Sequence, residues 1–205
     1  MKHPLPWLIL IALLATTLVW LAFFWTPAGT PESDQHQRLA ADSEARGGEF
    51  TLRGPNGPVA LSAQRGKVVL LYFGYTFCPD VCPTSLVLIA QALGALTPEE
   101  RQQVRAFFVS VDPERDTPDV LRAYAPFFHP DIVGLTGSAQ EIAAVARLYG
   151  ARYMKQPARD GAPYAVDHSS YTYVISPDGT LAGRLPHASP ASEIVAMIRA
   201  RLQGK

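Results

Sequence analysis

The chain has 205 residues, with 18 Lys and Arg against 18 Asp and Glu, so its formal net charge is zero. That balance argues against a general nucleic-acid binder, which usually carries an excess of basic residues. Hydrophobic residues make up 48% of the chain and charged residues 18%, a composition that excludes a disordered chain. The two cysteines are too few for a disulfide-rich miniprotein, so the length favours one globular domain with a short additional segment.

The N-terminal segment is apolar. Residues 7–25 carry no charged side chain and have Trp residues at both ends, as in the aromatic belts of membrane helices. As a helix rising about 1.5 Å per residue they would span about 28 Å, close to a hydrocarbon core of about 30 Å. Lys2 precedes the run and no basic residue follows it until Arg38, so the positive-inside rule sends the rest of the chain across the membrane. We therefore expect residues 1–25 to be a membrane anchor with one transmembrane helix.

A cleaved signal peptide is the alternative for this segment. Its apolar region is usually only about 7–15 residues long and is followed by an Ala-x-Ala-like site. The run here is longer, and Thr26-Pro27-Ala28 follows it, with proline in an unfavourable place. An Arg- and Ser-rich transit sequence is absent. In either case the domain is exported. A bacterial inner membrane, crossed once with the C-terminal domain in the periplasm, fits best.

The composition changes twice after the apolar run. Residues 26–48 contain Pro, Gly, Ala and alternating charges, with Leu39 as their only large apolar residue. They predict a flexible tether with a mean reach of about 26 Å, which a short helix over residues 35–46 would shorten. From Glu49 the composition is that of a packed domain, so residues 49–205 are expected to fold together.

The packed domain shows a regular alternation of strand and helix patterns. Residues 49–61 predict a hairpin, because two short strand-like runs flank a Gly-Pro-Asn-Gly turn. Continuous apolar runs predict buried strands, and apolar residues at helical spacing behind Pro, Thr or Ser start signals predict helices. In chain order, the remaining expected elements are a strand at 67–74, a helix at 83–96, a strand at 104–111, a helix at 117–128, a strand at 132–135, a helix at 138–149, strands at 171–176 and 181–185, and a helix at 189–202.

This order predicts an α/β topology. Crossover helices force the early strands to be parallel, whereas the late hairpin adds antiparallel strands. The result is a thioredoxin-like sandwich with an added N-terminal β-hairpin. In such a sheet, ligand chemistry belongs at the carboxyl ends of the parallel strands.

Both cysteines fall at that location. Cys78 and Cys82 lie between the central strand and the first helix, in a loop with two prolines. Their spacing lets both sulfurs converge, either as a disulfide or as two metal ligands. Cys82 is expected at the helix N-terminus, where backbone N–H groups and the helix dipole stabilise a thiolate. The alternative is a pair of buried structural cysteines.

A third ligand would favour metal binding over redox work. Of the five histidines, His168 stands in residues 167–170, immediately before the strand at 171–176. In a thioredoxin-like fold that loop lies beside the cysteine loop, so ligation and a surface-loop position are both open for His168. The other histidines are expected either before the packed domain or on its solvated surface: His3, His36, His129 and His187.

Three motifs carry a resemblance to a known family. They read Gly-Tyr-Thr-Phe-Cys-Pro-Asp-Val-Cys-Pro at 74–83, Val-Asp-Pro-Glu-Arg-Asp-Thr-Pro at 111–118 and Val-Asp-His-Ser at 166–169. In this order they resemble the Sco (SenC) family of membrane-anchored, thioredoxin-like copper proteins that assemble cytochrome c oxidase. The resemblance implies copper ligation by Cys78, Cys82 and His168. It also implies two partners, a copper donor protein and the copper-bearing subunit of the oxidase. Residues 185–190 match no family motif.

The donor set agrees with copper. Two thiolates and one imidazole suit Cu(I), can hold Cu(II) and could bind Zn(II). Asp167 is expected either to hold the imidazole or to cap its loop, and Asp80 either to tune the thiols or to be solvated. Four charged residues follow the second parallel strand and form either a solvated turn or a support for the site: Asp112, Glu114, Arg115 and Asp116.

Two functions remain open, a copper metallochaperone and a thiol–disulfide oxidoreductase. In the second, Cys78 and Cys82 would be a redox-active pair that reduces the cysteines of an oxidase subunit before metal arrives. Dedicated oxidoreductases usually carry Cys-x-x-Cys, one residue shorter than the spacing here, which favours the metallochaperone. A peroxidase is disfavoured, because Tyr75 and Pro79 stand three residues before the two cysteines in place of an activating Thr.

Overall fold

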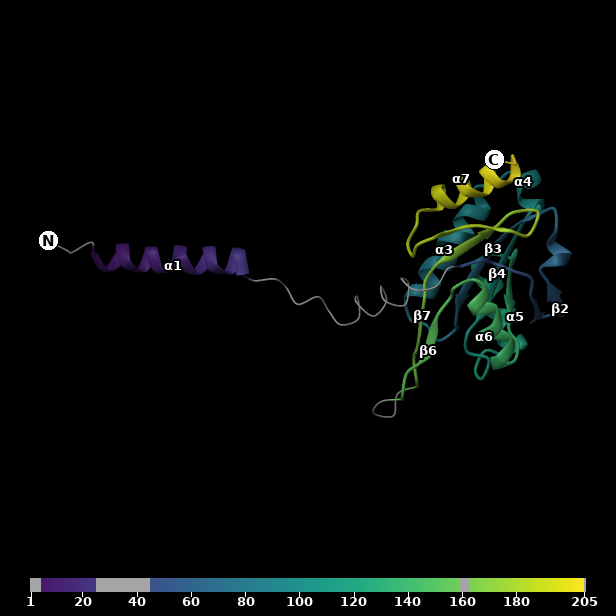
Figure 1. Ribbon diagram of the computed structural model, residues 1–205, viewed down its shortest axis with the longest axis horizontal. Coiled ribbons are helices and arrows are strands. Elements are labelled where there is room, and N and C mark those ends of the chain that lie inside the picture. Colours follow the sequence, from purple (N-terminus) through teal and green to yellow (C-terminus); the bar gives the residue numbers. More distant parts are fainter. Residues whose placement is uncertain (1–4, 25–44, 159–162, 205) are drawn as a thin grey trace. The chain divides into compact units, whose positions relative to one another are not determined.

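The computed structural model describes residues 5–24, 45–158 and 163–204 (Figure 1). The chain divides into two compact units, Met1–Gln35 and His36–Lys205. Most of the predicted tether lies outside the described residues, so its boundaries at 26 and 48 stay a prediction.

The described residues of the first unit form helix α1 (Leu5–Phe24), which has no acidic residue in its first turn and no basic residue in its last. A search of the described residues finds no helix that is both long enough and apolar enough to cross a membrane. The expected transmembrane helix is therefore not confirmed. Trp25, the last residue of the predicted span, lies outside the described residues.

The second unit begins with the predicted hairpin. Strands β1 (Thr51–Gly54) and β2 (Gly57–Ala60) pair antiparallel. Gly57 has a φ of +122°, a backbone conformation that favours glycine and allows the tight turn. A short 3-10 helix, η1 (Ser62–Gln64), follows.

A five-stranded sheet forms the centre of this unit. Its strands are β3 (Val68–Gly74), β4 (Val104–Ser110), β5 (Ile132–Leu135), β8 (Thr172–Ile175) and β9 (Leu181–Leu185), in the order β5-β4-β3-β8-β9. Strands β3, β4 and β5 are parallel, whereas β8 and β9 run antiparallel, as predicted. All seven residues of β3 are buried, because this continuous apolar run occupies the middle of the sheet.

Five helices accompany the sheet in the described part of this unit: α3 (Val81–Gly94), α4 (Pro98–Gln102), α5 (Pro118–Phe128), α6 (Ala139–Leu148) and α7 (Ala191–Leu202). The predicted caps are confirmed. Thr117 accepts a hydrogen bond from the Val120 amide, and Ser138 forms a capping box with Glu141. Helices α3 and α7 pack side by side (Figure 1). Helix α4 was not expected. The sequence does carry a start signal for it, because Thr97 and Glu100 form a capping box.

A second hairpin was also not expected. Strands β6 (Tyr153–Lys155) and β7 (Val166–His168) pair antiparallel as a separate two-stranded sheet, with Tyr153 opposite His168. The loop expected at 167–170 is thus a strand in its first half. Each strand has three residues, too few for a period-2 pattern to be seen in the sequence.

Candidate metal centre

The cysteine loop joins the carboxyl end of β3 to the start of α3. Cys78 is half-buried in the loop, where its amide donates to the Tyr75 carbonyl over 3.3 Å. Cys82 lies in the first turn of α3 and has no exposed surface. Both sulfurs are free thiols. The predicted location of the cysteines, at the carboxyl end of a central parallel strand, is confirmed.

Gly74 explains how Cys82 reaches this depth. A Cβ atom at Gly74 would lie 2.5 Å from Cys82 Sγ and 2.8 Å from the ring of Phe108. Real Cβ contacts are essentially never that short, so only glycine lets the sulfur rest against the end of β3.

His168 meets the cysteines from β7. Its Nε2 lies 3.2 Å from Cys82 Sγ, and its Nδ1 lies 3.2 Å from the carbonyl oxygen of Ser169. A carbonyl can only accept, so Nδ1 carries a ring hydrogen and donates it to Ser169, which leaves Nε2 facing the sulfur. Tyr72 and Tyr75 pack edge-on against the imidazole at 6.3 and 5.8 Å between ring centroids. The imidazole is therefore oriented as a metal ligand requires.

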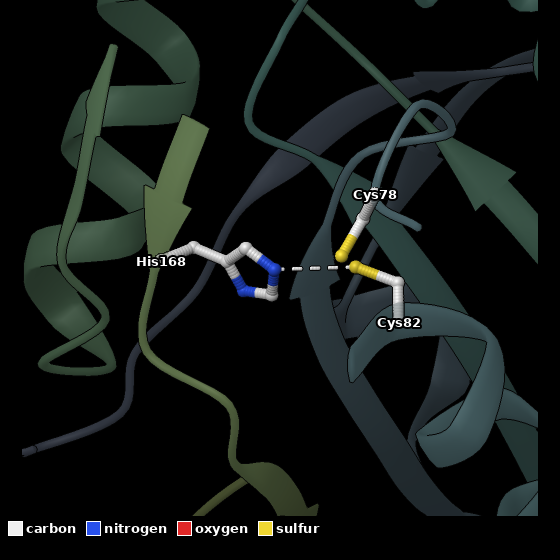
Figure 2. A group of neighbouring side chains, drawn as sticks. All are labelled: Cys78, Cys82 and His168. Carbon is white, nitrogen blue, oxygen red and sulfur yellow. Dashed lines mark hydrogen bonds between the residues drawn. The ribbon is translucent and has the colours of Figure 1, made fainter. Parts of the chain in front are cut away.

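The three side chains converge (Figure 2). One ligand atom from each of Cys78, Cys82 and His168 lies within 4.8 Å of the other two. Two sulfurs and one imidazole nitrogen form a soft donor set, which suits Cu(I) and other thiophilic metals. Among the described residues, this is the one group of three or more His, Cys, Asp or Glu side chains that lie close enough together to hold a metal ion.

The two thiols differ strongly in acidity. The hydrogen bond from Cys82 lowers the pKa of Cys78 to about 3, with His168 a smaller cause. Burial raises the pKa of Cys82 well above its ordinary value. The thiolate expected at Cys82 from its place in the first helical turn is therefore on Cys78, because desolvation of the buried sulfur outweighs the helix dipole.

The charged loop after β4 supports the site. Of the two alternatives given for it, a solvated turn or a support, the structure favours the support. Asp116 is fully buried and accepts hydrogen bonds from the Thr76 amide at 2.9 Å, the Thr76 hydroxyl at 2.6 Å and the Ser110 hydroxyl at 2.6 Å. Thr76 begins the cysteine loop. A charge-assisted network of this kind fixes the base of the loop.

Arg115 joins the cysteine loop to the histidine hairpin. Its guanidinium lies 4.8 Å from the centre of the Phe77 ring and 3.7 Å from that of Tyr164, and it donates to the Tyr164 carbonyl over 2.8 Å. It also pairs with Asp112, which accepts a 2.8 Å hydrogen bond from the Tyr164 hydroxyl. Sequence reasoning missed Tyr164. No local signal marks it, since its partners are 49 and 52 residues away.

The exposed rim of the hairpin has one more link to this loop. Lys155 Nζ lies 2.6 Å from Glu114 Oε2, and both side chains are largely exposed. All four charged residues predicted for the loop after β4 thus have partners in the structure. Three of them, Asp112, Glu114 and Arg115, contact the hairpin that carries His168.

Two other predicted aspartates do not touch the imidazole. Asp167 accepts a hydrogen bond from the Gln156 side chain across the hairpin, so holding the imidazole falls to the Ser169 carbonyl. Asp80 is exposed and accepts a 3.3 Å hydrogen bond from the Thr84 hydroxyl. Neither aspartate side chain is brought to the sulfurs, although the backbone of Asp80 hydrogen-bonds to Cys78 and helps to lower its pKa.

The remaining histidines lie apart from the metal centre. His187 is exposed, as expected, and its Nδ1 lies 3.1 Å from the hydroxyl of Ser85. His129 is half-buried in place of the solvated position expected, and its Nδ1 accepts the Asp131 amide over 3.1 Å. His3 and His36 lie outside the described residues.

The fold and this site define a thioredoxin-like protein in which two thiols and an imidazole form a group that could hold a metal ion. The family model for SCO1/SenC matches residues 38–203. The chain belongs to the SCO1/SenC family. The mitochondrial protein SCO2 homolog of Bos taurus is 39% identical over 198 residues, which cover 91% of this chain and 73% of that protein.

Two solved structures extend the comparison. ScoI of Bradyrhizobium japonicum, solved with copper bound, is 39% identical with a TM-score of 0.69, covering 76% of this chain and 99% of that one. BsSco, described as having a disulfide switch and as a member of the Sco family of cytochrome c oxidase assembly proteins, is 26% identical with a TM-score of 0.61, covering 80% of this chain and 98% of that one. Both support the thioredoxin-like Sco fold found here.

Proposed function

We propose that this protein is a copper metallochaperone that helps to assemble the copper site of cytochrome c oxidase. The observation that carries the proposal is the convergence of Cys78, Cys82 and His168, whose ligand atoms lie within 4.8 Å of one another. We take these three as the copper ligands. A relative solved with copper bound and another described as an oxidase assembly protein support the choice of metal and of pathway.

The donor set suits delivery as well as binding. Two sulfurs and one imidazole can hold Cu(I) or Cu(II) and leave a coordination position free. The ligands of the copper-bearing oxidase subunit can enter through that position, as can those of a copper donor protein. Cys78 is the more exposed of the two thiols, so exchange with a partner begins on its side.

The proposal includes attachment to the bacterial inner membrane. The uncharged run over residues 7–25 and the basic residue before it support a single-pass anchor, with the copper domain in the periplasm. Residues 1–25 then form the anchor, 26–48 the tether and 49–205 the copper-binding domain. A tether of that length lets the domain reach a membrane-bound oxidase subunit.

A thiol–disulfide oxidoreductase is the second candidate, and the unequal thiols favour it. The Cys78 thiolate can attack a disulfide of the oxidase subunit and release one of its thiolates. Cys82 then attacks the Cys78 sulfur of the mixed disulfide. The subunit is released with both of its thiols reduced, and Cys78 and Cys82 remain as a disulfide. This reaction does not use His168.

Copper titration of the full chain under reducing conditions tests the proposal, with wild type beside His168→Ala. We expect one copper per wild-type chain, and an affinity at least about 10–100-fold lower in the variant, since a ligand is lost. His187→Ala is the matched control and should bind copper as wild type does. Disulfide exchange should persist in His168→Ala.

Two results would contradict the metallochaperone. If copper stayed bound after Cys78 and Cys82 had been oxidised to a disulfide, the two thiolates could not be its ligands. Normal oxidase assembly at low copper in cells that carry His168→Ala would leave the oxidoreductase as the function.

A further inference from the structure

A second polar site lies at the opposite end of the central sheet. A hollow of about 610 Å³ opens where β3, β4 and β5 begin. Its lining includes four basic side chains, one amide, one acid and two prolines: Lys67, Arg101, Arg105, His129, Gln102, Asp131, Pro98 and Pro130. The volume is in the range of sites that hold small ligands. In a chain with zero net charge, this gathering of cations is local.

Two of these cations have no acidic partner. Among the described residues, no carboxylate pairs with Lys67 or Arg105, although both side chains are half-buried. The Arg105 guanidinium donates to the carbonyl oxygen of Val104 over 2.9 Å. The one acid of the lining, Asp131, already lies 3.7 Å from Arg101. Partly buried cations that lack a counter-charge gain most from a bound anion.

The histidine adds a donor to this set. Nδ1 of His129 accepts the amide of Asp131, so Nε2 carries the ring hydrogen and can donate. Two guanidinium forks, an ammonium and an imidazole N–H offer more donors than the two oxygens of a carboxylate can accept. A phosphate group, with three terminal oxygens, matches them better.

The rest of the lining limits what the phosphate is attached to. No Phe, Tyr or Trp side chain lines the hollow, and its apolar residues are the two prolines. A nucleobase would find none of these larger rings to stack on, and the lining is mainly polar. We infer that the hollow binds the phosphate group of a compact, hydrophilic molecule. A phosphomonoester lipid headgroup and a soluble phosphate share this chemistry, because each presents three terminal oxygens.

A headgroup in this hollow would orient the domain. Lys67 precedes β3 and Gly74, next to Cys82, ends it. A strand of this length extends about 20 Å. With a lipid phosphate at one end of β3, the metal centre at the other end would face away from the bilayer, toward a partner. This consequence rests on the membrane attachment proposed above, whereas phosphate binding does not.

Calorimetric titration of the full chain in a neutral maltoside detergent tests the inference. The probes are inorganic pyrophosphate, dihexanoyl phosphatidic acid and dihexanoyl phosphatidylcholine. We expect pyrophosphate, phosphatidic acid or both to bind, and the zwitterionic diester lipid to bind at least about tenfold more weakly. Competition between the first two supports one shared site, and the tighter of them identifies the source of the phosphate.

Variants assign any binding to the hollow. Lys67→Gln combined with Arg105→Gln should weaken binding at least about tenfold, because two charge-assisted contacts are lost. Arg122→Gln removes one positive charge elsewhere on the surface and should leave binding unchanged. Arg105→Lys, which keeps the charge, should give an intermediate loss.

The inference would be overturned if none of the probes bound, if the two lipids bound equally, or if Arg122→Gln weakened binding as much as the double variant. Copper binding by the double variant is the check on folding and should equal that of wild type. Copper binding by the wild-type chain separates the two proposals. Its failure would count against the metallochaperone and would not affect the phosphate site.

Discussion

Cys82 Sγ lies 3.2 Å from His168 Nε2, yet the two residues come from parts of the molecule that are built differently. The cysteines follow β3, a strand buried along its whole length, and Cys82 is already inside α3. Backbone pairing on both sides of β3 fixes this region. Gly74 then sets how closely the sulfur approaches the strand.

The histidine side is held largely by side chains. Strand β7 pairs with β6 and with no strand of the central sheet. Polar links from the hairpin to the body of the domain include three in which Arg115 donates to the Tyr164 carbonyl, Tyr164 donates to Asp112, and Lys155 pairs with Glu114. Beside them, Val166 is buried in the hydrophobic core.

The difference assigns separate roles to the two sides. Thiol geometry is a property of the core, so changes there should affect folding and metal binding together. Imidazole geometry depends on the loop after β4, so changes there should affect metal binding with little effect on folding. Four predictions test this division, in order of decreasing effect.

Alkylation of Cys78 should show the largest contrast. Because the hydrogen bond from Cys82 lowers its pKa to about 3, Cys78 should remain a thiolate between about pH 8 and about pH 5. Iodoacetamide should therefore modify it at a nearly constant rate, whereas an ordinary cysteine loses roughly a thousand-fold of its thiolate over that range. Mass spectrometry measures the rate. Cys82→Ala, which removes the donor, should restore a steep profile and His168→Ala should not. A steep profile in His168→Ala would mean that the hairpin maintains the thiolate.

Gly74→Ala should damage the cysteine side. The added methyl group would lie against Cys82 Sγ and the Phe108 ring, so the sulfur must move. We expect a loss of about 1–3 kcal/mol in unfolding free energy, as for other overpacked cores, and up to about 100-fold in copper affinity. Denaturant unfolding and copper titration measure the two losses. Gly94→Ala, which adds a methyl group into open space on α3, should show neither.

Arg115→Lys should weaken the histidine side alone. Lysine keeps a positive charge beside Asp112 but loses the planar fork that reaches Tyr164 and the stacking on its ring. We expect copper affinity to fall about tenfold and the unfolding midpoint to change little.

A double-mutant cycle makes this test specific. In a His168→Ala background, Arg115→Lys should have no further effect on copper affinity, because the ligand it orients is gone. Arg122→Lys, at an exposed ion pair, is the control and should not change affinity. Additive losses from Arg115→Lys and His168→Ala would show that Arg115 does not act through the histidine.

Lys155→Met should have the smallest effect. The ion pair with Glu114 is largely exposed, and such pairs contribute little. We expect copper affinity to fall less than about threefold at low ionic strength and the difference to vanish near 1 M salt, where charges are screened within about 3 Å. Copper titration at two salt concentrations is sufficient. A loss that persists at high salt would give Lys155 a role beyond the ion pair.

The sequence by itself determined much of the fold and the identity of the metal ligands. Continuous apolar runs predicted β3 and β4, and the Thr117 and Ser138 caps predicted where α5 and α6 begin. These are signals between neighbouring residues, so they can be read along the chain. The short spacing of Cys78 and Cys82 at the start of a helix is a signal of the same kind.

Only the tertiary structure decided how the site is held and charged. His168 lies 86 residues after Cys82, and Tyr164 lies 49 residues after Arg115, so no local pattern brings either pair together. The same limit applies to the thiolate. The helix position of Cys82 is visible in the sequence, but the burial that raises its pKa comes from packing between elements distant in the chain. Desolvation depends on everything that surrounds an atom, and the surroundings exist only once the chain has folded.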